Sequence, residues 1–275
     1  MNDSDSVTFV REAGSSAAGP TVLCLHSNAS SSGQWRSLME LLAPRFRVLA
    51  PDQLGAGRSP PWPPGKGSGD GRLDDEVALL APVLDRMPGR FHLVGHSYGG
   101  ALAMRLALSQ PGRVLSLVMF EPTLFALLEQ QQPGGAAAAG IARAAGAAAQ
   151  AVALGDLDSA GRVFIDYWMG DGTWQAMPAE RRSSTADAMR PIGTWAQALF
   201  AETATLNDIA RLPMPVMLMG GSRSQASARE VLRLLRQALP QARAVTLPDV
   251  GHMGPVTHAE AVNREIEAFL LTQPG

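Results

Sequence analysis

FHLVGHSYGGALAMRLALS, residues 91–109, is the stretch that decides the fold. It opens with a short apolar run typical of a buried strand and ends with apolar residues at helical spacing. The segment between them, 95–99, reads GHSYG and fits the pattern G-x-S-x-G. A serine at such a sharp strand-to-helix turn has strained backbone geometry, and only small residues two positions away let the chain pass itself. The turn predicts Ser97 as a nucleophile at a helix N-terminus, and the alternative is a tight turn with an inert serine.

Short apolar runs and helical patterns alternate on both sides of this turn. The predicted strands are 21–26, 46–50, 91–95, 114–120, 215–220 and 243–247. The predicted helices are 34–42, 74–86, 99–110, 226–239 and 257–271. Near-continuous apolar strands separated by helices indicate a parallel sheet that is covered on both faces. We therefore expect an α/β fold with a mostly parallel central sheet flanked by helices.

Residues 122–212 break the alternation, because they hold helical segments and no convincing strand. We predict a core domain from 1–121 and 213–275, with an inserted helical cap at 122–212. The alternative is a long, alanine-rich ordinary crossover. The Pro/Gly-rich stretch 60–71 is expected to be an exposed, mobile loop.

The composition is that of a globular protein, with 46% hydrophobic and 17% charged residues in 275. A net charge of −2 gives no electrostatic basis for binding nucleic acid or an anionic membrane. Cys24 is the only cysteine, so no disulfide forms within the chain, and its apolar surroundings predict a buried thiol. The acidic N-terminus does not resemble a signal peptide, and no apolar run is long enough to span a membrane. We expect a cytoplasmic protein without membrane insertion, and formation of a homo-oligomer stays open.

His252 is the predicted general base. It follows the strand 243–247 and a short loop, close to the C-terminus, where a histidine can reach the edge of the sheet that carries Ser97. The other four histidines are assigned structural or surface positions: His26 ends a strand, His92 lies inside one, His96 flanks the turn and His258 starts the last helix.

Taken together, these segments resemble the α/β-hydrolase family over nearly the whole chain. Besides the turn at Ser97, 26–28 (HSN) is similar to the family's His-Gly-x segment, 52–59 (DQLGAGRS) to its D-x-x-G-x-G-x-S loop, and 251–253 (GHM) to its histidine loop. The resemblance implies that the backbone N–H groups of Asn28 and Tyr98 form an oxyanion hole. It also implies that Asp52 organises its loop and does not react.

The chain departs from the family pattern at two positions. Ser27 replaces the usual glycine, so we expect a slightly different oxyanion hole in which the Ser27 hydroxyl or the Asn28 side chain is a candidate extra donor. Ser224 stands where the family commonly has the triad aspartate, and a hydroxyl cannot stabilise imidazolium as a carboxylate does.

The missing carboxylate has to come from another segment. Glu121 directly follows the strand 114–120, and a minority of the family places the acid there. We therefore predict a Ser97–His252–Glu121 triad. Asp249 and Asp208 are the weaker alternatives.

The expected chemistry is acyl transfer to water, with an ester or lactone of a small apolar molecule as substrate. The predicted substrate-binding residues are Trp168, Phe125, Trp195 and Met253, and the alternative for the cap aromatics is packing of the cap helices on each other. Three cap arginines are candidates to meet an anionic group, and the alternative is that their charges are exposed: Arg181, Arg182 and Arg190. No metal or organic cofactor is expected, because no Cys, His or carboxylate cluster has ligand spacing. C–C, thioester and amide hydrolysis stay open, as does a binding protein without turnover. Opening of haloalkanes or epoxides is disfavoured, because those family members need a carboxylate nucleophile where this chain has Ser97.

Overall fold

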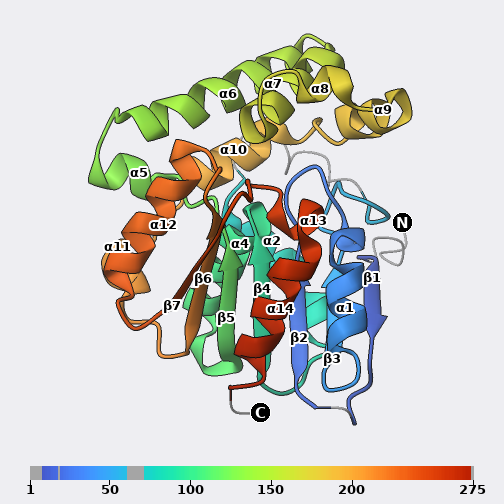
Figure 1. The fold of residues 1–275 in the computed structure, drawn as a ribbon, viewed down its shortest axis with the longest axis vertical. Helices are drawn as coiled ribbons and strands as arrows, with labels where there is room; N and C mark the ends of the chain where they lie inside the picture. Colours follow the sequence, from blue (N-terminus) through green and yellow to red (C-terminus); the bar gives the residue numbers. More distant parts are fainter. Residues whose placement is uncertain (1–7, 18, 61–70, 274–275) are drawn as a thin grey trace, which may run out of the picture.

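A seven-stranded sheet with the order β1-β3-β2-β4-β5-β6-β7 forms the centre of the computed structural model, which describes residues 8–17, 19–60 and 71–273 (Figure 1). The strands are β1 Val10–Ala13, β2 Thr21–Leu25, β3 Arg47–Pro51, β4 Phe91–His96, β5 Val114–Phe120, β6 Val216–Gly221 and β7 Arg243–Leu247. All neighbours pair in parallel except β1, which pairs antiparallel with β3. This confirms the predicted α/β fold with a mostly parallel sheet. The edge strand β1 was not predicted.

Alternate residues of the inner strands β2 to β6 pack into two different hydrophobic clusters. In β2, for example, Val22 and Cys24 join one cluster, whereas Leu23 and Leu25 join the other. Both sets are fully buried, as the apolar runs predicted. One cluster includes residues of α1 (Arg36–Leu42) and α14 (Ala259–Leu270), and the other includes residues of α2 (Leu73–Leu79), α4 (Tyr98–Ser109) and α12 (Ala226–Ala238).

Two of the predicted core helices differ from the observed ones in their bounds. The helix predicted at 74–86 is divided into α2 and α3 (Ala81–Leu84), with Pro82 in the first turn of α3. Proline has no N–H for the helical hydrogen-bond pattern, and it restricts the residue before it. The helix predicted at 257–271 is preceded by a separate turn, α13 (Gly254–Thr257). Two 3₁₀ turns, η1 Ser32–Trp35 and η2 Pro111–Arg113, complete the core. Most of the loop predicted at 60–71 lies outside the described residues.

The segment between β5 and β6 is entirely helical where it is regular. Its helices are α5 Ala126–Gln131, α6 Ala136–Ala153, α7 Leu157–Met169, α8 Thr173–Ala176, α9 Ala179–Asp187, α10 Ile192–Phe200 and α11 Leu206–Ile209. Figure 1 shows α6 to α10 across the upper end of the sheet, whereas α11 lies lower, beside α12. This arrangement supports our proposal that 122–212 is a cap.

The strand register positions the site. β4 and β5 pair with His96 opposite Phe120, and β5 and β6 pair with Phe120 opposite Met219. The residues that follow the first pair, Ser97 and Glu121, therefore leave two neighbouring strands at the same edge of the sheet.

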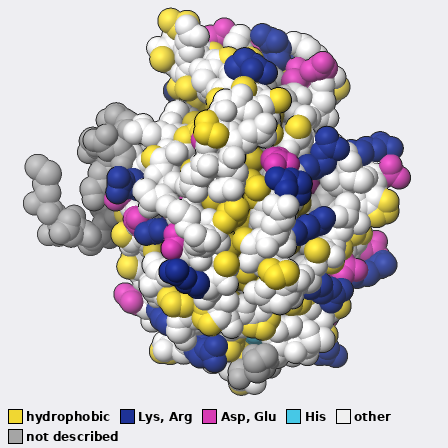
Figure 2. Space-filling model, turned by 90° about the vertical axis from the view of Figure 1, so that its left-hand side faces the viewer, with side chains coloured by type: hydrophobic (Ala, Val, Ile, Leu, Met, Phe, Trp, Pro, Cys, Tyr) yellow, Lys and Arg dark blue, Asp and Glu magenta, His cyan; other side chains and the backbone are white. Residues whose placement is uncertain are grey.

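On the face shown in Figure 2, basic and acidic side chains are interspersed. None of the described helices combines the length and the apolar content needed to cross a membrane.

Candidate active site

Ser97 lies in the turn between β4 and α4, with backbone angles φ 56° and ψ −119°. A residue with a side chain rarely adopts this conformation, so the surrounding structure has to impose it. The two flanking glycines permit the turn: a Cβ atom on Gly95 would overlap the carbonyl group of Gly99, and one on Gly99 would overlap the carbonyl group of Leu25. The sharp turn that the motif predicts is therefore present, and it holds Ser97 6% exposed at the edge of the sheet.

His252 bridges Ser97 and Glu121. Its Nε2 atom is 2.9 Å from Ser97 Oγ, and its Nδ1 atom is 2.8 Å from Glu121 Oε2. Because a carboxylate only accepts, Nδ1 carries the proton and donates to Glu121, which leaves Nε2 to accept from the serine hydroxyl. His252 is 3% exposed and Glu121 is fully buried. The structure thus brings the three residues of the predicted triad together in the order that proton transfer from serine requires.

Glu121 is held in place by its own backbone and by β6. Its φ of 45° is another left-handed conformation, and its N–H donates to the carbonyl of Met219 over 2.9 Å. Its second carboxylate oxygen, Oε1, accepts from the N–H of Gly221 at 2.7 Å and from the hydroxyl of Ser224. Ser224, which stands where the family commonly has its aspartate, is therefore a hydrogen-bond donor to the carboxylate that contacts His252.

The two alternative acids point elsewhere. Asp249 is 75% exposed and pairs with Arg223 at 2.7 Å. Asp208 caps α11 through Thr205. Neither contacts His252.

Two side chains contact His252 in ways that the sequence did not predict. His96 is fully buried, and its Nε2–H donates to the backbone carbonyl of His252 over 2.8 Å. Burial lowers the pKa of His96 well below its ordinary value, so the ring is neutral and structural. The indole of Trp168, on α7, stacks on the imidazole of His252 with ring centroids 3.8 Å apart and an angle of 21° between the planes. The proposed cap thus covers one face of the histidine.

The expected oxyanion hole has its two residues near Ser97. Tyr98 is the first residue of α4, so its N–H has no acceptor within the helix. Asn28 lines the same cavities as Ser97 and precedes Ala29, which has a φ of 53°. The Ser27 hydroxyl donates to Gln34 Oε1 at 3.0 Å. It is therefore engaged there and is not an extra donor.

The tyrosine ring is anchored below the site. Tyr98 Oη donates to the buried carboxyl of Glu76 over 2.8 Å. Burial raises the pKa of Glu76 to about 7. It also raises the pKa of Tyr98 well above its usual value, so the phenol stays protonated and able to donate.

Neighbouring polar residues organise loops. The carboxylate of Asp52 accepts from the backbone N–H of Ser32 at 2.6 Å and of Arg58 at 2.7 Å. His26 Nε2 accepts from the N–H of Gln53 at 3.0 Å, and its Nδ1 atom lies 2.7 Å from the carbonyl of Ser27. Both residues therefore hold neighbouring loops in place through backbone hydrogen bonds, as the sequence predicted for Asp52.

Two cavities meet at Ser97. The inner cavity is the smaller and narrower of the two, and the outer cavity is larger. The inner cavity is lined by Asn28, Ser97, Thr123, Phe125, Ile141, Ala145, Phe164, Trp168, Ile192, Ala196, Leu199 and Phe200. The outer cavity is lined by Ser27, Asn28, Ala29, Ser97, Phe164, Ile165, Trp168, Met169, Met177, Arg181, Thr185, His252 and Met253. Ser97 can therefore be approached from an apolar side and from a mixed side.

The predicted substrate-binding residues are divided between these cavities. Phe125 lines the inner cavity, Met253 the outer cavity and Trp168 both. Trp195 is not among the lining residues, because its ring packs against Tyr98 with centroids 6.0 Å apart. Of the three cap arginines only Arg181 reaches a cavity at Ser97. Arg190 forms an ion pair with Asp187, and Arg182 Nη1 lies 3.5 Å from Gln175 Oε1.

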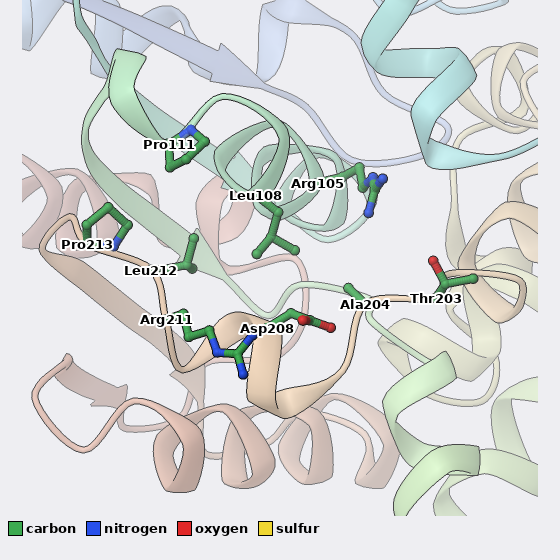
Figure 3. Close-up of a pocket in the computed structure, with 9 residues that line it drawn as sticks. All are labelled: Arg105, Leu108, Pro111, Thr203, Ala204, Asp208, Arg211, Leu212 and Pro213. Atoms are coloured by element: carbon green, nitrogen blue, oxygen red, sulfur yellow. The ribbon is translucent and has the colours of Figure 1, made fainter.

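A third, larger hollow lies away from the triad, between α4 and the segment 203–213 (Figure 3). Two of its charged side chains already have partners: Arg105 pairs with Asp74 and Glu202, and Asp208 accepts from the N-cap residue of α11, Thr205. It shares no lining residue with the two cavities at Ser97. We therefore do not assign it to the chemistry. Within the described residues, no group of three or more His, Cys, Asp and Glu side chains is arranged to hold a metal ion.

Comparison with known proteins places this geometry in a family. A family model described as alpha/beta hydrolase fold matches residues 20–259. A pimeloyl-[acyl-carrier protein] methyl ester esterase of Nitrosomonas europaea is 29% identical over 237 residues, which is 85% of this chain and 89% of the relative. A haloalkane dehalogenase of Mesorhizobium japonicum is 43% identical over only 118 residues, 42% of this chain and 36% of the relative.

Solved structures agree on the fold. The enol-lactonase from Burkholderia xenovorans LB400 has a TM-score of 0.76 at 18% identity, with 96% of each chain covered. An esterase from Thermogutta terrifontis has a TM-score of 0.74 at 21% identity, with 96% of this chain and 92% of the other covered. The chain belongs to the alpha/beta hydrolase fold family.

Proposed function

We propose that the protein is a serine hydrolase that cleaves a carboxylic ester or lactone of a small, largely apolar molecule through an acyl-enzyme. The observation that carries this proposal is the hydrogen-bonded chain from Ser97 through His252 to Glu121. Its polarity leaves Nε2 of the histidine free to take the serine proton.

The reaction follows from that polarity. Ser97 Oγ attacks the carbonyl carbon while His252 Nε2 takes its proton, and Glu121 stabilises the imidazolium that forms. The N–H groups of Asn28 and Tyr98 donate to the oxyanion, which develops negative charge only in the transition state. His252 then protonates the leaving alkoxide. Water, activated by the same histidine, attacks the acyl-enzyme and releases the acid.

The two cavities support a substrate with an acyl part and an alcohol part. The inner cavity is small and mostly apolar, which suits a short acyl chain. The outer cavity carries His252, which must reach the leaving oxygen, so the alcohol part belongs there. The relatives named for ester and lactone hydrolysis agree with this choice.

A non-catalytic binding protein is the second candidate. The argument for it was the missing aspartate at Ser224, but Glu121 occupies the corresponding role in hydrogen bonding to His252. We therefore rank hydrolysis first.

Turnover of a substrate panel tests the proposal. The panel contains short-chain and long-chain p-nitrophenyl esters, a lactone, a thioester and an amide, each assayed with wild type and with Ser97→Ala. We expect ester or lactone turnover that falls by at least about 10³-fold in Ser97→Ala. Absence of wild-type turnover, or turnover that survives in Ser97→Ala, would contradict it. Faster cleavage of the thioester or amide would reassign the scissile bond.

A further inference from the structure

The inner cavity is lined by two residues that each have a buried polar atom without a hydrogen-bond partner. Among the described residues, Thr123 Oγ1 and Asn28 Oδ1 are buried and have no hydrogen-bond partner. Both residues line the inner cavity beside Ser97, and the rest of its lining is apolar except for Ser97 itself. Buried polar groups normally have a partner, because an unpaired group loses its hydration without compensation. Two such atoms on residues that line one cavity next to a nucleophile point to a ligand that supplies the partner.

Thr123 is fixed close to the reacting centre. Its N–H donates to the carbonyl of Ser97 over 3.2 Å, and its own carbonyl accepts from Phe125 N–H at 2.9 Å. Its side chain is 3% exposed. Asn28 approaches from the oxyanion segment. A substituent that meets both side chains must therefore lie near the scissile carbonyl group and not at the far end of an acyl chain.

The chemistry of these two atoms selects the substituent. A threonine hydroxyl donates or accepts, whereas an amide oxygen only accepts. A hydroxyl on the substrate accepts from Thr123 and donates to Asn28, so it satisfies both. A keto oxygen only accepts and leaves Asn28 Oδ1 unpaired. A charged substituent finds no counter-ion, since no ionisable side chain lines the inner cavity.

Resting on the proposed function, we propose that the inner cavity binds a hydroxyacyl group, with its hydroxyl on the first or second carbon after the scissile carbonyl. Thr123 and Asn28 are the residues that select it. An acyl chain without the hydroxyl leaves both polar atoms unpaired, and sites built to hydrogen-bond a substrate hydroxyl discriminate strongly against such analogues.

The test compares matched esters in matched variants. Methyl butyrate, methyl 2-hydroxybutyrate, methyl 3-hydroxybutyrate and methyl 2-oxobutyrate are assayed by pH-stat with wild type, Thr123→Val and Thr123→Ser. Val has nearly the shape of Thr without the hydroxyl, and Ser keeps the hydroxyl. The readout is the kcat/KM of each substituted ester divided by that of methyl butyrate, compared between enzymes, which cancels the intrinsic reactivity of the esters.

We expect the ratio of one of the two hydroxy esters to fall about tenfold from wild type to Thr123→Val and to hold in Thr123→Ser, while the ratio of the keto ester falls less. Equal ratios in all three enzymes, or a fall in Thr123→Val that is larger for the keto ester than for either hydroxy ester, would overturn the inference while leaving ester hydrolysis intact. Titration calorimetry of Ser97→Ala with the same esters separates the two proposals if turnover is absent. If Ser97→Ala binds a hydroxy ester more tightly than methyl butyrate, and adding Thr123→Val to Ser97→Ala abolishes that preference, the hydroxyacyl site is supported even without hydrolysis. If Ser97→Ala shows no such preference, the inference is refuted.

Discussion

Replacing Glu121 by Gln tests the triad most sharply, because the structure fixes how the new amide must lie. Glu121 Oε1 accepts from Gly221 N–H and Ser224 O–H, whereas Oε2 faces the Nδ1 atom of His252. In Glu121→Gln the amide oxygen keeps the two donors only if the NH₂ group faces the histidine. The opposite orientation sets NH₂ against the N–H of Gly221 and leaves this buried donor unpaired, at a cost of about 1–3 kcal/mol, whereas the Ser224 hydroxyl can rotate and accept.

This orientation reverses the tautomer of His252. Nδ1 must then accept from the NH₂ group, so the ring proton moves to Nε2, which can no longer take the proton of Ser97. The same replacement of the acid in a Ser-His-Asp triad lowers kcat about 10⁴-fold, or about 5 kcal/mol in the activation barrier. We expect a loss of that order here, with no change of fold, since the two donors to position 121 stay paired.

The assay is kcat and KM on the best ester of the panel, with urea unfolding as the control for stability. Ser224→Ala is the matched control: it removes one neutral donor to the same carboxylate and should lower kcat by no more than about tenfold. A kcat of Glu121→Gln within tenfold of the wild-type kcat would refute the assigned proton pathway.

Three further predictions concern the surroundings of the triad. Gly99→Ala should destabilise the fold by at least about 2 kcal/mol in chemical denaturation, because its Cβ would overlap backbone, whereas Gly112→Ala, which meets nothing within 4 Å, should stay within about 0.5 kcal/mol. Burial raises the pKa of Glu76 to about 7 in the folded state, so wild type loses stability as pH rises from about 4.5, where the unfolded chain begins to release this proton, to about 7. Gln at position 76 does not titrate, so the unfolding free energy of Glu76→Gln minus that of wild type should be about 3 kcal/mol larger at pH 8 than at pH 4. A stability difference that is flat with pH would contradict this. Trp168→Ala should lower kcat/KM about 10-fold to 100-fold by freeing the ring of His252, and Trp168→Phe should lose less; equal activity in both variants would remove the stacking from the account.

The parallel sheet was predictable because the inner strands β2 to β6 are apolar on both of their faces, which gives near-continuous apolar runs in the sequence. Cys24 and Leu25, for instance, are neighbours in β2 but belong to different clusters, and both are buried. β1 escaped detection because its sequence, VREA, is short and polar and its residues are only partly buried. Its position depends on pairing with β3, a long-range contact that leaves no local pattern.

The candidate triad could be inferred because carboxyl ends of neighbouring parallel strands meet at one edge. Ser97 and Glu121 follow paired residues of β4 and β5, so the register alone brings them together. The contacts of Trp168 and Trp195 could not be inferred, because they depend on how α7 and α10 lie over the sheet. Trp168 stacks on the imidazole, whereas Trp195 packs against Tyr98, and both had seemed equal candidates for the pocket.

The most direct measurement of the central claim is to map where a phosphorylating ester inhibitor, diethyl p-nitrophenyl phosphate, attaches to the chain. The account predicts a single adduct on Ser97 by peptide mass spectrometry, absent in Ser97→Ala and strongly slowed in His252→Ala. No adduct on the folded protein, or an adduct on another residue that persists in Ser97→Ala, would contradict it.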